Sequence, residues 1–482
     1  MPNIRLWNWA IAFVLALTSL RVITLYFAQI DLFVDESQYW FWGQSPDFGY
    51  YSKPPLIGWV IRAVTDVAGS DSAFWVRLPA PILHGITALI LGSIARRYVS
   101  VQAGLVVTVG YATLPLVVVG STLISTDTIM FPFLAGALAC YLRYFETDHR
   151  RWIVFAGGLL GCAAMAKYAG VYYILCACCA AVFLPRYRMQ APVWLSGLGA
   201  FLLVISPNVL WNFANGFSTA QHTLDNADWV RDPSENASIN FPGLLEFLAA
   251  QLAVFGPVLF VVFVMLGCGF FRSYRPPYRS ALLVFSIPIV LLVCMQAVLS
   301  QAYANWAAAA YLAASVVVLP VLLSHKYLLI LSFAINGALS VLLPLAVVNA
   351  DKFSIDGRSL VMARYVDIEK MSLDIFEVAE QNSQSLIVAR NRDVLADMFY
   401  TLRDKPLIIR STPPKARAAN HYALSYPLVA PHPNETMLLV LHARKELPCV
   451  AEKVAEFQNN RGHYKDDVFI GYIAPSTCFD RR

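Results

Sequence analysis

The sequence predicts an α-helical polytopic membrane protein with about eleven transmembrane helices and a small C-terminal α/β domain outside the membrane. Of its 482 residues, 58% are hydrophobic and only 14% are charged, whereas ordinary soluble domains have roughly 25% charged residues. The charge is also unevenly distributed, since residues 1–350 carry 32 charged side chains and residues 351–482 carry 35. We therefore expect a membrane domain over 1–350 and a soluble domain over 351–482.

The membrane domain is predicted from eleven apolar segments. The first is long enough to cross a bilayer, which takes about 20 residues, and no small-residue cleavage site follows it, so we interpret it as a retained anchor. Only helices can satisfy their backbone groups in lipid across so many segments. Residues 152–184 fit either one bent span or two short ones. The segments are 9–28, 78–98, 102–119, 126–145, 152–166, 168–184, 192–210, 244–269, 281–299, 306–323 and 326–348.

The basic residues predict the orientation of these segments. Twelve of the 18 Lys and Arg before residue 350 fall in loops on the side of the N-terminus, and twelve of the 14 acidic residues fall on the other side. By the positive-inside rule the N-terminus is cytoplasmic, and the loops 30–77 and 211–243 lie outside together with the tail. The net charge of +5 is dispersed, so no nucleic-acid partner is expected.

The tail alternates strand-like and helix-like runs, which is typical of a small α/β domain. It contains no Gly-rich phosphate loop. If the tail is exported, Cys449 and Cys478 are free to form a disulfide. The predicted strands are 386–389, 406–409, 437–441 and 467–473, and the predicted helices are 367–381, 394–402 and 448–459.

The first outer loop contains the most promising catalytic residues, in the sequence DESQYW. Asp35 and Glu36 point to different sides if they begin a helix in the membrane interface. One interpretation makes Asp35 a general base that removes a proton from an attacking hydroxyl, with Glu36 orienting it. The alternative is a pair of acids favoured by the helix dipole.

The same loop ends in a rigid basic segment. Lys53 lies between Tyr51 and two prolines that keep the backbone extended. A fixed ammonium suits a phosphate, although a Lys that snorkels to water fits equally well. The aromatic residues Tyr50 and Tyr51 suit either an interfacial belt or stacking on a sugar.

Three further charged residues are candidates because charges at a membrane surface are costly unless they face water, a partner or a substrate. Asp127 opens the segment 126–145, as a substrate contact or as a helix-start acid. Lys167, in AKYAG, is not a residue type expected where two apolar helices pack. Together with Arg77 it is a candidate phosphate ligand. No ligand spacing identifies a metal, so a divalent metal is left open and no cofactor is assigned.

The run DESQYWFWGQSPDFGYYSKPPLIGW resembles the signature of bacterial membrane glycosyltransferases of the GT-C superfamily. It is most similar to the protein O-mannosyltransferase-like family, which includes the aminoarabinose transferase of lipid A and rhizobial lipopolysaccharide galacturonosyltransferases. The stretches ISTDTIMFPF, AMAKYAGVYY, SPNVLWNFANGF and ANWAAAAYLA resemble other family segments in the expected order. The resemblance covers most of 1–350.

This resemblance implies an enzyme of the bacterial inner membrane with a periplasmic C-terminal domain. It would transfer a sugar from a polyprenyl-phosphate donor to a glycolipid acceptor among the membrane lipids, inverting the anomeric carbon. The family's Asp in the first outer loop falls on Asp35, with Glu36 completing the pair, and the Lys of its Lys-Pro-Pro segment falls on Lys53. Further substrate contacts are implied at Trp211, Asn212, Asn305 and Trp306.

Two alternatives remain open at this point. One is a protein O-glycosyltransferase that uses the same type of donor. The other is a lipid or solute transporter, which would place polar residues and broken helices at mid-membrane. Only Arg21 lies well inside a predicted span, which disfavours transport.

Overall fold

The computed structural model divides the chain into two compact units. Unit 1 comprises Met1–Leu25, Lys53–Ile57 and Arg77–Pro344, and unit 2 comprises Tyr26–Ser52, Gly58–Val76 and Leu345–Arg482. The predicted division near residue 350 thus recurs, but most of the first outer loop falls in unit 2. The structure describes residues 2–226, 239–270, 278–350, 352, 354–355, 358–359, 362–414, 418–429 and 435–479.

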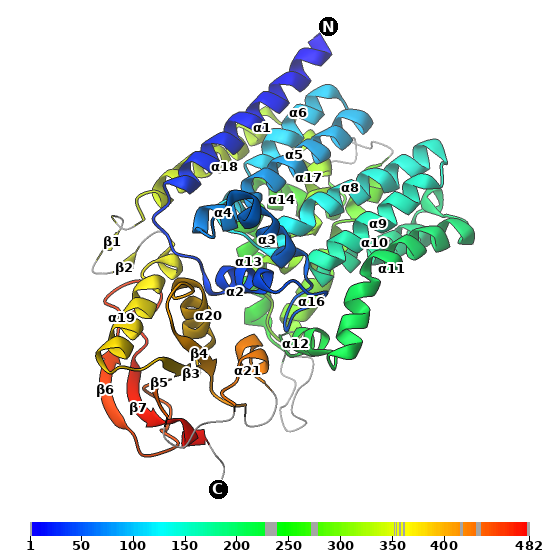
Figure 1. Ribbon diagram of the computed structural model, residues 1–482. Helices are drawn as coiled ribbons and strands as arrows, with labels where there is room; N and C mark the ends of the chain where they lie inside the picture. The colour runs from blue at the N-terminus through cyan, green and yellow to red at the C-terminus, as the bar shows by residue number, and fades with distance from the viewer. Residues whose placement is uncertain are drawn as a thin grey trace. The chain divides into compact units, whose positions relative to one another are not determined.

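Unit 1 is a bundle of helices, drawn in blue, cyan and green in Figure 1. The pairs α5–α6, α8–α9 and α9–α11 pack along each other. Close approach is possible because Gly157 of α9 lies against the backbone of Gly197 of α11, as small residues allow between membrane helices. The helices are α1 (Pro2–Tyr26), α5 (Pro79–Tyr98), α6 (Val101–Ala112), α7 (Pro115–Gly120), α8 (Thr126–Thr147), α9 (Arg151–Ala166), α10 (Tyr172–Phe183), α11 (Ala191–Ala214), α12 (Ser218–Asn226), α13 (Phe241–Val254), α14 (Pro257–Gly267), α15 (Arg279–Val284), α16 (Ile287–Leu299), α17 (Ala310–Leu322) and α18 (Lys326–Val347).

Helix α17 forms the core of unit 1. Every residue from Ala310 to Leu322 is buried, and the helix packs against α5, α6, α8 and α14. A helix that is apolar all round belongs inside a protein or a membrane. The segment that precedes it, the 3₁₀ turn η3 (Ala304–Ala307), is therefore tied to the centre of the bundle.

Two breaks in the bundle bear on the predicted spans. Residues 152–184 form two helices, α9 and α10, separated at Lys167 by the 3₁₀ turn η1 (Tyr168–Val171). The segment 244–269, predicted as a single span, is broken in the structure, since α13 and α14 meet at 118°. The bend follows from Gly256, whose φ of +92° favours glycine, followed by Pro257 at the start of α14.

The described residues contain six helices long and apolar enough to cross a membrane, or seven if the bent pair is one span. Four further apolar helices are shorter. The prediction of a multi-spanning helical protein is confirmed, whereas the number eleven stays a prediction. Of the predicted outer loop 211–243, residues 227–238 lie outside the described part of the chain.

Unit 2 contains a five-stranded mixed sheet of order β4-β3-β5-β7-β6. Strand β3 is parallel to β4 and β5, while β7 is antiparallel to β5 and β6. Helices α19 (Ile368–Gln381) and α20 (Arg392–Thr401) pack on each other above the strands in Figure 1. The strands are β3 (Leu386–Ala389), β4 (Ile408–Ser411), β5 (Thr436–His442), β6 (Glu452–Phe457) and β7 (Phe469–Pro475), and a separate pair is β1 (Ser354–Ile355) with β2 (Arg358–Ser359).

The predicted helix over 448–459 is wrong, because Glu452–Phe457 forms the edge strand β6. Val450, Val454 and Phe457 have helical spacing, which explains the error. In the structure Phe457 pairs with Phe469 of β7 and enters the core. Cys449 and Cys478 form a disulfide that ties the start of this segment to the end of the chain.

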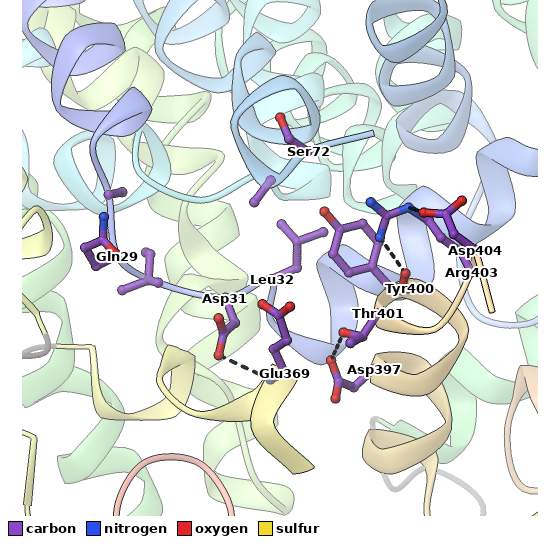
Figure 2. A pocket seen from close by; sticks show the side chains of 13 residues that line it. Gln29, Asp31, Leu32, Ser72, Glu369, Asp397, Tyr400, Thr401, Arg403 and Asp404 are labelled. Atoms are coloured by element: carbon purple, nitrogen blue, oxygen red, sulfur yellow. Dashed lines mark hydrogen bonds and ion pairs between the residues drawn. The ribbon is translucent and has the colours of Figure 1, made fainter. Parts of the chain in front are cut away.

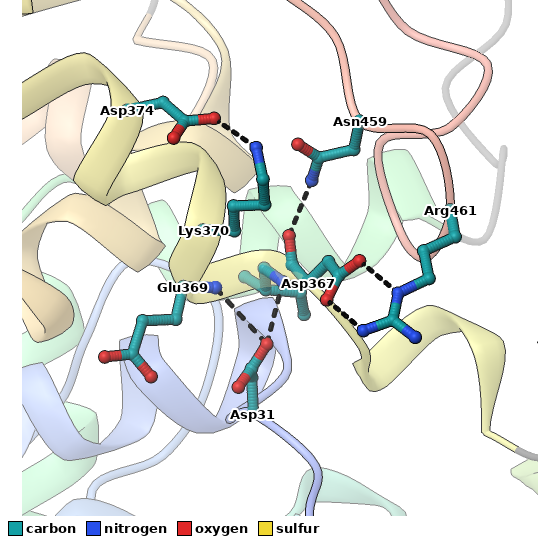
Figure 3. A network of polar contacts seen from close by, with 8 residues as sticks. Asp31, Asp367, Glu369, Lys370, Asp374, Asn459 and Arg461 are labelled. Atoms are coloured by element: carbon teal, nitrogen blue, oxygen red, sulfur yellow. Dashed lines mark hydrogen bonds and ion pairs between the residues drawn. The ribbon is translucent and has the colours of Figure 1, made fainter. Parts of the chain in front are cut away.

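The outer-loop segments of unit 2 form α2 (Val34–Gln44), α3 (Leu56–Ala68) and α4 (Ala73–Arg77). Helix α2 packs on α20 through the rings of Phe41 and Phe399, whose centroids are 4.6 Å apart. Asp31, just before α2, accepts hydrogen bonds from the backbone N–H groups of Ile368 (2.8 Å) and Glu369 (3.3 Å), as Figure 3 shows. A carboxylate there satisfies the free N–H groups at the start of α19.

Candidate active site

Unit 1 brings together three predicted site residues. The ammonium of Lys167 donates to both carboxylate oxygens of Asp127, each at 2.8 Å. The side-chain amide of Asn305 donates to Asp127 Oδ2 at 2.9 Å. The side chains of Lys167 and Asp127 are only 17% and 8% exposed, so this is a largely buried, charge-assisted cluster.

Helix ends position the cluster. Ser125 caps α8 by accepting from the Thr128 N–H, which puts Asp127 in the first turn of that helix. Lys167 is the residue at which α9 ends, in an extended conformation, and Asn305 lies in η3. Three separate breaks in the helices therefore supply one polar cluster.

A second group of hydrogen-bonded side chains begins at Tyr168, the residue that follows Lys167. The hydroxyl of Tyr168 donates to Asn208 Oδ1 at 2.8 Å and accepts from the amide of Asn212 at 3.1 Å. Asn212 is buried, and its Oδ1 has no hydrogen-bond partner among the described residues. A buried amide with an unused acceptor suits a hydroxyl-bearing ligand, consistent with the expected substrate role of Asn212.

In unit 2 the predicted base Asp35 forms an ion pair with Arg392, the first residue of α20. Arg392 Nη2 donates to Asp35 Oδ1, and Arg392 Nε donates to Gln38 Oε1 at 3.0 Å. Burial alone would lower the pKa of Arg392, but the charge of Asp35 and the hydrogen bond to it raise that pKa above its ordinary value. The Asp35 side chain is 47% exposed.

Glu36, next to Asp35 on α2, is only 2% exposed. Its Oε2 accepts from the backbone N–H of Phe33 at 3.0 Å, which is half of a capping box, since Phe33 has no side-chain acceptor. This contact gives Glu36 a role in starting α2. A catalytic role for Glu36 stays a prediction.

The aromatic residues of the first loop pack against one another. Tyr50 stacks on Trp42 with centroids 4.8 Å apart and planes at 2°, and its hydroxyl donates to the Trp42 carbonyl at 2.8 Å. Burial raises the pKa of Tyr50 to about 12. Tyr51 donates to the Ala418 carbonyl at 2.9 Å. Both rings are buried, so they brace the loop.

The remaining predicted site residues lie at helix ends, in a turn or in the first outer loop. Lys53 is half-buried just before α3, and Arg77 is 1% exposed at the end of α4. Trp211 is half-buried in the last turn of α11. Trp306, in η3, packs edge-to-face on Tyr303. Their predicted contacts with substrate stay predictions.

A cavity of about 480 Å³ lies elsewhere in unit 2 (Figure 2). Asp31, Glu369, Asp397 and Arg403 are among its lining residues, and none of the predicted site residues lines it. Burial raises the pKa of Asp397 to about 8, although hydrogen bonds from Ser372 and Thr401 act in the opposite direction. This carboxyl is therefore largely protonated at neutral pH.

Among the described residues, no group of three or more His, Cys, Asp or Glu side chains is arranged to hold a metal ion. The sequence reasoning missed Arg392 and Gln38. Gln38 follows Asp35 by three residues and thus shares its helix face, which is a signal present in the sequence. Arg392 gave no such signal, because it is 357 residues away.

Comparison with known proteins places these features in a family. The family model for dolichyl-phosphate-mannose-protein mannosyltransferases matches residues 52–211, which include Lys53, Asp127 and Lys167. The lipid A galacturonosyltransferase RgtD of Rhizobium johnstonii is 35% identical over 469 residues, covering 96% of this chain and 98% of that protein. The chain belongs to the GT-C glycosyltransferase family.

The fold of this glycosyltransferase agrees with that assignment. Two crystal structures of ArnT from Cupriavidus metallidurans, one in the apo state and one bound to undecaprenyl phosphate, match it with TM-scores of 0.66 and 0.65. Each match covers 96% of this chain and 98% of ArnT, at 13% and 12% sequence identity. These matches show a likeness of fold over most of the chain.

Proposed function

We propose that this glycosyltransferase moves a sugar from a polyprenyl-phosphate donor to a glycolipid of the bacterial envelope, lipid A or lipopolysaccharide core. The observation that carries the proposal is the 35% identity to a lipid A galacturonosyltransferase along 96% of the chain. Galacturonic acid is accordingly the first sugar to test. The dolichyl-phosphate donor named for the family model and the undecaprenyl phosphate bound to ArnT support the donor class.

We place the reaction at the periplasmic face of the inner membrane, with the N-terminus in the cytoplasm and the C-terminal domain in the periplasm. The distribution of basic residues supports this orientation. Nucleotide sugars are not expected outside the cytoplasmic membrane, so a lipid-borne donor fits this location.

In the proposed reaction the acceptor hydroxyl attacks the anomeric carbon opposite the phosphate and gives its proton to Asp35. The bond from the anomeric carbon to the phosphate oxygen breaks, and the electron pair leaves with the polyprenyl phosphate. Asp35 Oδ1 is held by Arg392, while Oδ2 has no hydrogen bond from a described residue and can take the proton. Attack from the opposite side inverts the anomeric configuration.

The leaving phosphate needs a cation where its charge develops. We assign this role first to Lys53. Lys167 uses two of its three N–H donors on Asp127, which leaves it one donor and a largely neutralised charge. Arg77, fully buried at the end of α4, is the third candidate.

The proposal is tested by mass spectrometry of lipid A and core from a strain that lacks this protein. The deletion should remove one sugar, and the wild-type gene should restore it. Asp35→Asn should not restore it, whereas Asp66→Asn should, because Asp66 is a similarly exposed carboxylate paired with Arg62. An unchanged glycolipid profile in the deletion strain would contradict the proposal. Labelled sugar on proteins instead of lipids would favour a protein O-glycosyltransferase, which the family model describes.

A further inference from the structure

The C-terminal segment contributes Arg392 to the proposed catalytic carboxylate. Arg392 Nη2 donates to Asp35 and Arg392 Nε donates to Gln38. Asp35 and Gln38 are three residues apart on α2, so one guanidinium spans one face of that helix. The planar guanidinium of Arg392 therefore fixes the orientation of the Asp35 carboxylate as well as placing a positive charge beside it.

The position of Arg392 is itself held firmly. The side chain of Asn391 caps α20 by accepting from the N–H groups of Asp393 (2.7 Å) and Val394 (3.2 Å). The cap fixes the backbone of the first helical residue, which is Arg392. Helix α20 is in turn packed on α2 through Phe399 and Phe41.

A cation at this place is unfavourable for α20 taken alone, because the N-terminus of a helix carries partial positive charge. The pair adds little to folding either. Its side chains are 38% and 47% exposed, and exposed ion pairs contribute only about 0–1 kcal/mol. A structural role thus explains the arrangement poorly.

The geometry at Asp35 suits a reactive group better. Oδ1 is occupied by the guanidinium, Oδ2 receives no hydrogen bond from a described residue, and nearly half of the side chain is exposed. Tyr39 on α2, Asp393 on α20 and Tyr422 on α21 (His421–Ser425) are the other titratable groups that interact electrostatically with the pair.

We infer that Arg392 is a positioning residue, which holds one oxygen of the Asp35 carboxylate and leaves the other directed toward the acceptor hydroxyl. This inference rests on the proposed function, in which Asp35 is the base. It gives the C-terminal segment a direct part in the reaction, since the last quarter of the chain completes a site that begins in the first outer loop.

The test uses the full-length protein in detergent, with a polyprenyl-phosphate-sugar donor and purified lipid A. Arg392→Met should lower kcat by about 10- to 100-fold, less than the roughly 10²- to 10⁴-fold contribution of a general base, and should change the KM for donor less than threefold. Arg392→Lys should restore part of kcat, because it keeps a cation beside Asp35. Arg62→Met, at the exposed pair with Asp66, is the matched control and should change neither kcat nor KM.

The outcomes separate the two proposals. If Asp35→Asn is inactive while Arg392→Met keeps wild-type kcat, the positioning role is wrong and the proposed base stands. If Asp35→Asn keeps wild-type transfer, the base assignment itself fails. Should Arg392→Met lower the melting temperature strongly, Arg392→Gln decides: a folded Gln variant with wild-type kcat overturns the inference. In the double variant with Asp35→Asn, loss of Arg392 should have no further effect on the residual rate.

Discussion

Lys167 and Asp127 form an ion pair through both carboxylate oxygens, although they lie 40 residues apart at the ends of different helices. Both side chains are mostly buried. Removing one partner of a buried pair leaves an uncompensated charge, which costs about 3–5 kcal/mol. The pair therefore holds the ends of α8 and α9 together.

We predict that Asp127→Asn and Lys167→Met each lower the melting temperature of the purified protein markedly. The double variant should be more stable than the sum of the two single effects, because it leaves no buried charge. Asp66→Asn, which breaks an exposed pair, should cost about 1 kcal/mol or less. Additive single effects would contradict a coupled pair.

The second prediction concerns Asp397, whose pKa is raised by burial from 3.8 to about 8. The folded state binds this proton more tightly than the unfolded state. Its favourable contribution is complete below about pH 4 and is lost as the pH rises to 8, by about 1.4 kcal/mol per pH unit. Asp397→Asn should therefore raise the melting temperature more at pH 8 than at pH 5.

The control for this measurement is Asp404→Asn, because the Asp404 side chain is 88% exposed near the end of the same helix. Its effect on the melting temperature should be small and equal at both pH values. A gain for Asp397→Asn that does not grow with pH would show that the buried carboxyl does not titrate as expected.

The third prediction compares two glycines of unit 2 with similar positive φ. A Cβ on Gly462 (φ +81°) would lie 2.1 Å from the Val366 carbonyl oxygen, whereas one on Gly69 (φ +62°) would meet nothing within 4 Å. Gly69→Ala should cost about 1 kcal/mol from backbone strain alone. Gly462→Ala should cost clearly more. Thermal unfolding of both variants tests this, and equal losses would refute the close contact.

The fourth prediction concerns the disulfide between Cys449 and Cys478, which closes a loop between residues 29 apart. A loop of this length is expected to contribute about 2–4 kcal/mol to stability. Cys449→Ser with Cys478→Ser should lower the melting temperature, and reductant should lower that of the wild type but not of the double variant. Cys178→Ser, at an exposed free cysteine of α10, should leave the response to reductant unchanged.

The local pattern of the sequence predicted most helices and the central strands. Strand β3 has the predicted bounds, and α19 and α20 lie within two residues of theirs at most ends. The errors occur where strand pairing or a single glycine, and not the pattern of apolar residues, determines the secondary structure. The segment around Val454 has a helical pattern, but pairing with β7 makes it a strand, and Gly256 bends a segment that hydropathy alone would extend.

The candidate site was predicted as single residues, not as pairs. Asp127, Lys167 and Asn305 were each identified, but nothing in the sequence indicates that their side chains meet, because contacts over 40 and 178 residues depend on helix packing. Arg392 was missed for the same reason. Its sequence context is that of an ordinary exposed helix start.

Unit 2 is assembled from both ends of the chain, and this imposes an order on biosynthesis. Asp31 is synthesised 337 residues before Ile368, whose N–H it caps. At 5–20 residues per second, the segment that contains Asp31 waits on the order of tens of seconds for its partners to be translated. Helix α2 and the proposed base can reach their final environment only after translation is nearly complete, so a nascent or truncated chain inserted in the membrane would remain catalytically silent.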